Sequence, residues 1–114
     1  MTLTAFLKKL YEAPETIEFE DAIKLIDQLY SYTPTAFRNG ELQNLAGENQ
    51  GSCKLLSFAK LHDLDEQSTL ACFGRYYRDE VLAKPTADSH QNIRNFIQTG
   101  WDGIEFDHPA LKEK

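Results

Sequence analysis

The chain has 114 residues, of which 41% are hydrophobic and 26% charged, and its 12 basic and 18 acidic side chains give a net charge of -6. This composition predicts one globular domain, residues 1–114, with enough apolar side chains for a core. The negative balance disfavours nucleic acid and anionic membrane surfaces as partners, because both attract clustered positive charge.

Two helices are predicted before residue 31. Apolar residues recur every three or four positions over residues 3–11, and Pro14 ends that pattern. The same spacing runs from Phe19 to Tyr30, with acidic residues near the start, where the helix macrodipole favours negative charge. The side chains of the first helix that we expect to face the core are Leu3, Phe6, Leu7, Leu10 and Tyr11.

A β-hairpin is predicted next. Residues 32–37 and 41–45 are typical of strands, and Asn39-Gly40 between them is the strongest short signal for a two-residue hairpin turn. With these two residues in the turn, Phe37 is expected to face Leu42 across the ladder.

Two further helices are predicted in the middle of the chain. Residues 52–62 are apolar on nearly all sides of a helix, so this element is expected to be the buried central helix. The next helix is capped by Asp65 and ended by Pro85. Gly74 lies in its middle, where glycine costs about 1 kcal/mol relative to alanine, so we expect a close backbone contact at that position.

The last part of the chain predicts a fifth helix and a short strand. Residues 88–91 resemble a capping box, and Gly100 is a typical C-terminal stop. Ile104–Asp107 alternates like a strand that adds to the hairpin, and residues 112–114 form a polar tail. The side chains of the fifth helix expected to face inward are Ile93, Phe96 and Ile97. The predicted fold is α+β, mainly helical, with about five helices and a small antiparallel hairpin or three-stranded sheet.

Several uncommon strings stand in a fixed order between residues 32 and 104. They are Tyr32-Thr33-Pro34-Thr35-Ala36-Phe37, Asn39-Gly40, Asn49-Gln50-Gly51-Ser52-Cys53-Lys54, Phe73-Gly74-Arg75-Tyr76-Tyr77-Arg78, His90-Gln91-Asn92-Ile93-Arg94-Asn95-Phe96 and Gly100-Trp101-Asp102-Gly103-Ile104. Taken together, they resemble the HopJ family of type III effectors. The resemblance implies a protein that a pathogen injects into plant cells. It brings no catalytic activity and no cofactor to carry over.

The cysteine content and the N-terminal residues bear on location. Cys53 and Cys72 both fall on predicted helices, where each is expected to be a small buried apolar side chain. Two cysteines are fewer than a secreted disulfide scaffold carries, and residues 1–13 lack the pattern of a secretory signal peptide. No apolar run approaches the roughly 20 residues that span a bilayer. We therefore expect a cytoplasmic protein, or one exported into a host cell by a type III system.

A polar cleft for a small anion is the leading candidate site. The start of the third helix, residues 49–54, and the start of the fifth, residues 90–94, are expected to converge, and helix starts present unpaired N–H groups to anions. The alternative is that these polar side chains satisfy loop backbone groups and that the cations pair with acids. The candidate binding residues are Asn49, Ser52, Lys54, Arg75, Arg78, Asn92 and Arg94.

A small Cys-His hydrolase or transferase is the alternative function. Cys53 would lie in the first turn of its helix, where the N-terminus and Lys54 favour the thiolate, with His90 as base and Asn92 or Asp102 as its orienter. The same cysteine equally fits the core, because free cysteine is among the most buried residue types. No metal site is expected from the spacing of His and Cys. The leading prediction is a non-enzymatic protein that binds a small anion or a protein partner.

Overall fold

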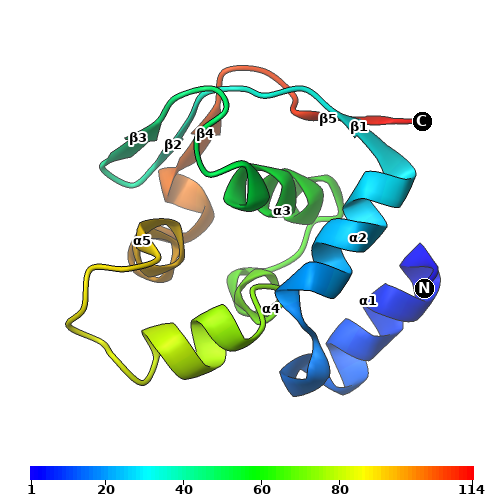
Figure 1. The fold of residues 1–114 in the computed structure, drawn as a ribbon, viewed down its shortest axis with the longest axis horizontal. Coiled ribbons are helices and arrows are strands. Elements are labelled where there is room, and N and C mark those ends of the chain that lie inside the picture. Colours follow the sequence, from blue (N-terminus) through cyan, green and yellow to red (C-terminus); the bar gives the residue numbers. More distant parts are fainter.

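The structure is a computed structural model that describes residues 1–114. Its α-helices are α1 (Leu3–Glu12), α2 (Phe19–Leu29), α3 (Gln50–Leu61), α4 (Glu66–Ala71) and α5 (Gln91–Thr99). Shorter helical segments are the 3₁₀ turns η1 (Pro14–Thr16) and η3 (Gly100–Gly103) and the π-helical η2 (Tyr76–Val81). The strands are β1 (Tyr30–Tyr32), β2 (Phe37–Asn39), β3 (Leu42–Asn44), β4 (Ile104–Phe106) and β5 (Leu111–Glu113). The predicted α+β, mainly helical fold is confirmed (Figure 1).

The strands form two small antiparallel sheets. In one, β2 lies between β3 and β4, so the predicted third strand of the hairpin sheet is confirmed. In the other, β1 pairs with β5 at the C-terminal end of the chain, with Ser31 opposite Lys112 (Figure 1). Within residues 112–114, predicted only as a polar tail, Lys112 and Glu113 therefore continue strand β5 and its pairing with β1. A strand ladder is made by backbone groups, so these residues pair with β1 while their side chains stay exposed.

The hairpin register differs from the prediction. In the structure Asn39 lies opposite Leu42, which Phe37 was expected to face, so the turn begins one residue later, at Gly40. Gly40 has a φ of +63°, which suits the first central position of a hairpin turn. The physical reason is tertiary: the buried Asn39 amide donates a hydrogen bond to the main-chain oxygen of Asn92, 2.8 Å away on α5. That bond holds Asn39 in the strand.

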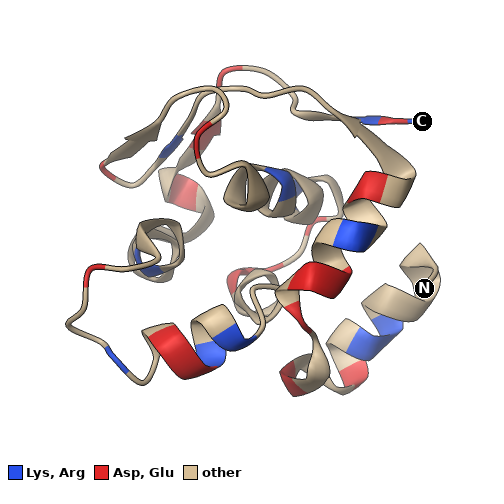
Figure 2. Cartoon of the chain, viewed as in Figure 1, with Lys and Arg blue, Asp and Glu red and all other residues tan.

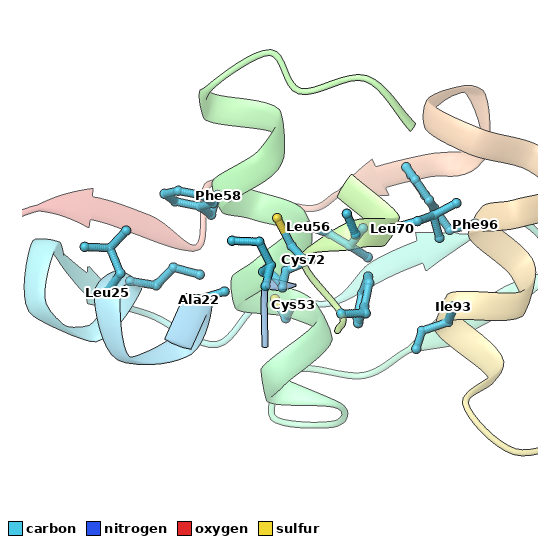
Figure 3. Packing of buried hydrophobic residues seen from close by; sticks show 14 of the residues in the cluster. Ala22, Leu25, Cys53, Leu56, Phe58, Leu70, Cys72, Ile93 and Phe96 are labelled. Carbon is cyan, nitrogen blue, oxygen red and sulfur yellow. The ribbon is translucent and has the colours of Figure 1, made fainter. Parts of the chain in front are cut away.

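Helix α3 is the centre of the core, as predicted. Its residues Cys53, Leu55, Leu56 and Phe58 are fully buried. Figure 3 shows Leu56 and Phe58 between residues of α2 on one side and residues of α5 on the other. Because a helix that is apolar on most of its sides must be largely covered, other elements pack around most of α3, and only its ends carry exposed side chains such as Lys60 and Leu61.

Three side chains that were expected to face inward or to lie on the buried helix are instead exposed. Tyr11 on α1 is 89% exposed, Leu61 at the end of α3 is 55% exposed, and Ile97 on α5 is 45% exposed. Leu61 is the last residue of its helix. Apolar spacing gives the direction of the core but leaves the width of the covered stripe open.

The predicted long fourth helix is broken. The Asp65 cap is confirmed, since its Oδ1 accepts a hydrogen bond from Ser68 N at 2.7 Å. The α-helix ends at Ala71, and Gly74, with a φ of +62°, leads into η2. A Cβ atom on Gly74 would lie only 2.8 Å from the backbone nitrogen of Phe19, so the predicted close backbone contact is confirmed. The same contact breaks the helix, because it requires the left-handed backbone that glycine permits.

Helix α5 begins later than the predicted capping box. Its first residue is Gln91, and the cap is His90, whose φ of +53° is left-handed and whose side chain makes no capping bond. The segment before it is held as a loop by the Arg94 guanidinium, which donates to the carbonyl oxygens of Lys84 and Ser89. Gly100 ends the helix as predicted, with a φ of +57°.

Candidate functional site

A cavity of about 580 Å³ opens between the starts of α3 and α5. The start of α3 contributes Asn49, Gly51 and Ser52 to its wall, and the start of α5 contributes residues 90–93. The lining also includes the aromatic residues Phe19, Phe73 and Tyr76, and the Phe19 ring lies against Gly51. We call this cavity the cleft. It joins the two helix starts that the sequence analysis expected to converge, although they are some forty positions apart in the chain.

Both helices present unpaired backbone N–H groups at the cleft. The first bonds of the two helices are Cys53 N to Asn49 O, 3.0 Å, and Arg94 N to His90 O, 3.1 Å. The N–H groups of residues 50–52 and 91–93 have no acceptor in the protein. Since the N–H groups of a first turn point out of the helix and carry partial positive charge, two such ends meet in one cavity.

The caps of both helices have unusual backbone conformations. Asn49 has a φ of +48° and His90 a φ of +53°, and neither side chain caps its helix. A non-glycine residue in this region costs of order 1–3 kcal/mol, and such strain is often found at ligand sites. The π-helical η2 also contributes Tyr76 to the cleft wall, and π-helical turns are frequent at functional sites.

A buried amide network supports the cleft from below. Asn92 Nδ2 donates to Asn44 Oδ1 at 3.1 Å, and Asn44 Nδ2 donates back to Asn92 Oδ1 at 3.2 Å. Asn39 Nδ2 also reaches Asn92 Oδ1, at 2.9 Å, and Asn49 Nδ2 donates to Asn44 Oδ1 at 2.7 Å. The amides of Asn49 and Asn92 therefore form the structural network that was the stated alternative. The sequence does not indicate Asn39 as a member of this network, because its Asn-Gly context predicts a turn.

Two of the candidate cations pair with acids near the start of α2. Arg75 Nη2 lies 2.8 Å from Glu20 Oε1, and its Nη1 lies 3.6 Å from Glu18 Oε2. Arg78 donates to the carbonyl oxygen of Ile17 at 2.9 Å and lies 3.3 Å from Glu18 Oε1. Figure 2 shows basic positions of the η2 region beside the acidic start of α2. Neither arginine lines the cleft.

The other two cations are also engaged away from the cleft. Lys54 Nζ lies 2.8 Å from Asp27 Oδ1 on α2. Arg94 donates to the carbonyl oxygens of Lys84, at 2.8 Å, and Ser89. Of the residues expected to bind a ligand, the structure therefore brings together Asn49, Ser52 and Asn92 at the cleft, and it uses the four cations to hold the surrounding segments.

Of the two residues of the alternative catalytic site, Cys53 is buried in the core and His90 lies at the cleft. Cys53 is 0% exposed, its Sγ lies 4.0 Å from the Thr35 carbonyl oxygen, and burial raises the pKa of its thiol. His90 does line the cleft, where its Nε2 lies 3.0 Å from Glu80 Oε1. The exposed thiolate that a cysteine nucleophile requires is absent from this arrangement.

No three His, Cys, Asp or Glu side chains are grouped so that they could hold a metal ion. None of the helices has the length and apolar character required to cross a bilayer.

A sequence model described as HopJ type III effector protein matches residues 3–111. The chain belongs to the HopJ type III effector family. The HopJ match includes every element that forms the cleft and extends beyond the strings from residue 32 to 104 that carried the resemblance. This HopJ protein is also similar to the crystal structure of a protein of unknown function, VPA0580, with 53% sequence identity and a TM-score of 0.98, over 100% of this chain and 95% of that chain. Comparison with curated proteins gives no match.

Proposed function

We propose that this HopJ protein is a non-enzymatic binding protein whose cleft takes a small organic ligand with an anionic group. The observation that supports this most is the meeting of two sets of unpaired helix N–H groups, residues 50–52 and 91–93, in one cavity of about 580 Å³. Oriented N–H groups bind carboxylates and phosphates without a side-chain cation. The ligand anion would lie against them.

The aromatic residues of the cleft suggest the rest of the ligand. Phe19 and Phe73 are stacked, with ring centroids 5.9 Å apart and an interplanar angle of 9°, and Tyr76 packs edge-on against Phe19. Aromatic walls with a few directed polar groups are typical of small-molecule sites. A ligand with a ring or another flat apolar part would therefore cover these rings while its anionic group lies on the helix starts.

We place the action of the protein in a host cell, after export by a type III system, on the strength of its family. A reporter fused to residues 1–114 should reach host cells only from bacteria with an intact type III apparatus. Equal signal from bacteria without that apparatus, or none from either, would remove the export part of the proposal and leave the cleft unaffected.

The cleft is tested with benzoate, which combines a carboxylate and a ring. In ¹H–¹⁵N NMR spectra, benzoate should shift the amide signals of residues 50–52 and 91–93 most strongly. Ser52→Phe should fill the cleft and reduce these shifts at least about fivefold. Ser68→Phe is the matched control, because Ser68 is likewise the third residue of its helix and lies outside the cleft.

The outcomes are distinct. Saturable shifts that Ser52→Phe removes and Ser68→Phe keeps support the proposal. Inorganic phosphate serves as a second probe, and shifts with phosphate alone would indicate an anion site without the aromatic part. No saturable shift at the six amides with either probe at tens of millimolar would refute a binding role for the cleft.

A further inference from the structure

A second cavity lies away from the cleft and shares no wall residue with it. It has a volume of about 540 Å³ and lies between the second half of α3 and the segment that joins β4 to β5, residues 106–111. In Figure 1 this segment passes from the sheet toward the C-terminus on the side of α3 away from α4. The wall includes Ser57, Lys60, Leu61, Phe106 and Pro109. We call it the rear cavity.

The outer wall of the rear cavity is held in place by hydrogen bonds. The main-chain N–H of His108 donates to Thr35 Oγ1 at 3.3 Å, and the Ala110 carbonyl accepts from Thr33 N at 2.8 Å. Ala110 is 3% exposed, so the end of this wall is anchored in the core. The cavity is therefore formed before any ligand arrives, which lowers the entropic cost of binding.

The lining of the rear cavity is largely apolar. Leu61 is 55% exposed, although it stands on the central helix of the core, and it faces this cavity beside Phe106. Exposed apolar side chains gathered in a concavity mark binding surfaces. The side chain of Ser57 belongs to the same wall, with its hydroxyl buried. The cavity thus favours a ligand with an apolar part.

The charged groups at the rear cavity indicate the sign of the ligand. Lys60 Nζ lies 5.7 Å from the centroid of the Phe106 ring, which places the ammonium over a wall of the cavity, and Lys60 has no acidic partner. Asp107 and His108 also belong to the wall. The Asp107 side chain is exposed, whereas the Lys60 ammonium lies against the aromatic lining. Lys60 is therefore the charge with a contact to the lining.

We propose that the rear cavity binds an amphipathic monoanion, an apolar chain or ring that ends in one carboxylate, with Lys60 as its counter-ion. The apolar part lies against Leu61 and Phe106, and the carboxylate lies at the mouth beside the ammonium. This site is independent of the cleft, because the two cavities have no residue in common.

Octanoate is the probe, and its binding is measured by ¹H–¹⁵N NMR. Octylammonium, which has the opposite charge, is the comparison. Octanoate should shift residues 57–61 and 106–111 and should bind more tightly than octylammonium. Lys60→Gln should reduce the affinity for octanoate about two- to fivefold, the range of an exposed ion pair. Asp107→Asn should leave the affinity for octanoate unchanged or raise it. Lys84→Gln, another exposed lysine outside both cavities, is the control and should change nothing.

A second pair of variants tests the apolar part. Leu61→Glu should reduce octanoate binding at least about tenfold, because it removes apolar surface and adds a like charge, while Ile97→Glu should have no effect on binding. Both positions are exposed, so both variants should fold. Tighter binding of octylammonium, shifts confined to the cleft, or equal affinity in Leu61→Glu and Ile97→Glu would each overturn the proposal.

Discussion

Gly74 is the position at which one added methyl group tests the fold most directly. It lies between α4 and η2 with a φ of +62°. A Cβ atom there would lie 2.8 Å from Phe19 N, 3.0 Å from Glu18 Cα and 3.1 Å from Ile17 O. All three are backbone atoms, so no side-chain rotation can make room. Gly74→Ala must therefore push η2 away from the start of α2.

The expected cost of Gly74→Ala has two parts. The left-handed conformation costs an alanine about 1–2 kcal/mol. Forcing a methyl group into a filled space costs about 1–3 kcal/mol more, through backbone shifts. The free energy of unfolding should therefore fall by about 2–5 kcal/mol, against a total of about 5–15 kcal/mol for a domain of this kind. The variant should fold, with a clear loss of stability.

Urea unfolding followed by circular dichroism measures this loss, and Gly47→Ala is the matched control. Gly47 has a φ of +90°, but nothing lies within 4 Å of a Cβ atom built on it. Gly47→Ala should therefore lose only the conformational part, about 1–2 kcal/mol. If both variants lose the same stability at unchanged denaturant dependence, the backbone contact at Gly74 contributes nothing and the reasoning is refuted.

Two further predictions concern titrating groups. Burial raises the pKa of the Cys53 thiol and raises the pKa of the Cys72 thiol to about 12. Both thiols should therefore react slowly with Ellman's reagent at pH 8 in the folded protein and quickly in urea. Fast labelling of Cys53 in the folded protein would restore the Cys-His alternative. Burial lowers the pKa of His62, whose Nε2 lies 2.8 Å from the Tyr30 hydroxyl, so the unfolded chain binds more protons below about pH 6.5. The His62 contribution to stability should be complete above that pH and be lost as the pH falls through it toward the folded pKa. Unfolding midpoints measured across pH 5–8 should show a shallower acid decline in His62→Gln, and superimposable profiles would contradict the assignment.

The features that the sequence alone predicted correctly are local or depend on periodicity. Residues 52–62 were expected to form the central helix because they are apolar on nearly all sides, and the observed helix, Gln50–Leu61, is the centre of the core. The Asp65 cap and the Gly100 stop were predicted from residues within one turn of each helix end. Gly74 predicted a close backbone contact because glycine in the middle of a predicted helix costs stability, which a close contact would explain.

Tertiary structure decided the features that depend on a distant partner. Asn39 left the predicted turn because its hydrogen bond to Asn92 joins residues 53 positions apart. Arg78 holds the Ile17 carbonyl instead of a ligand, again through a partner far along the chain. Local spacing specifies which side of an element is buried, and hydrogen-bond partners and cavities are set only when the elements pack. The sequence therefore determined the elements and their buried faces, whereas packing determined the hairpin register, the pairing of the cations and the shape of both cavities.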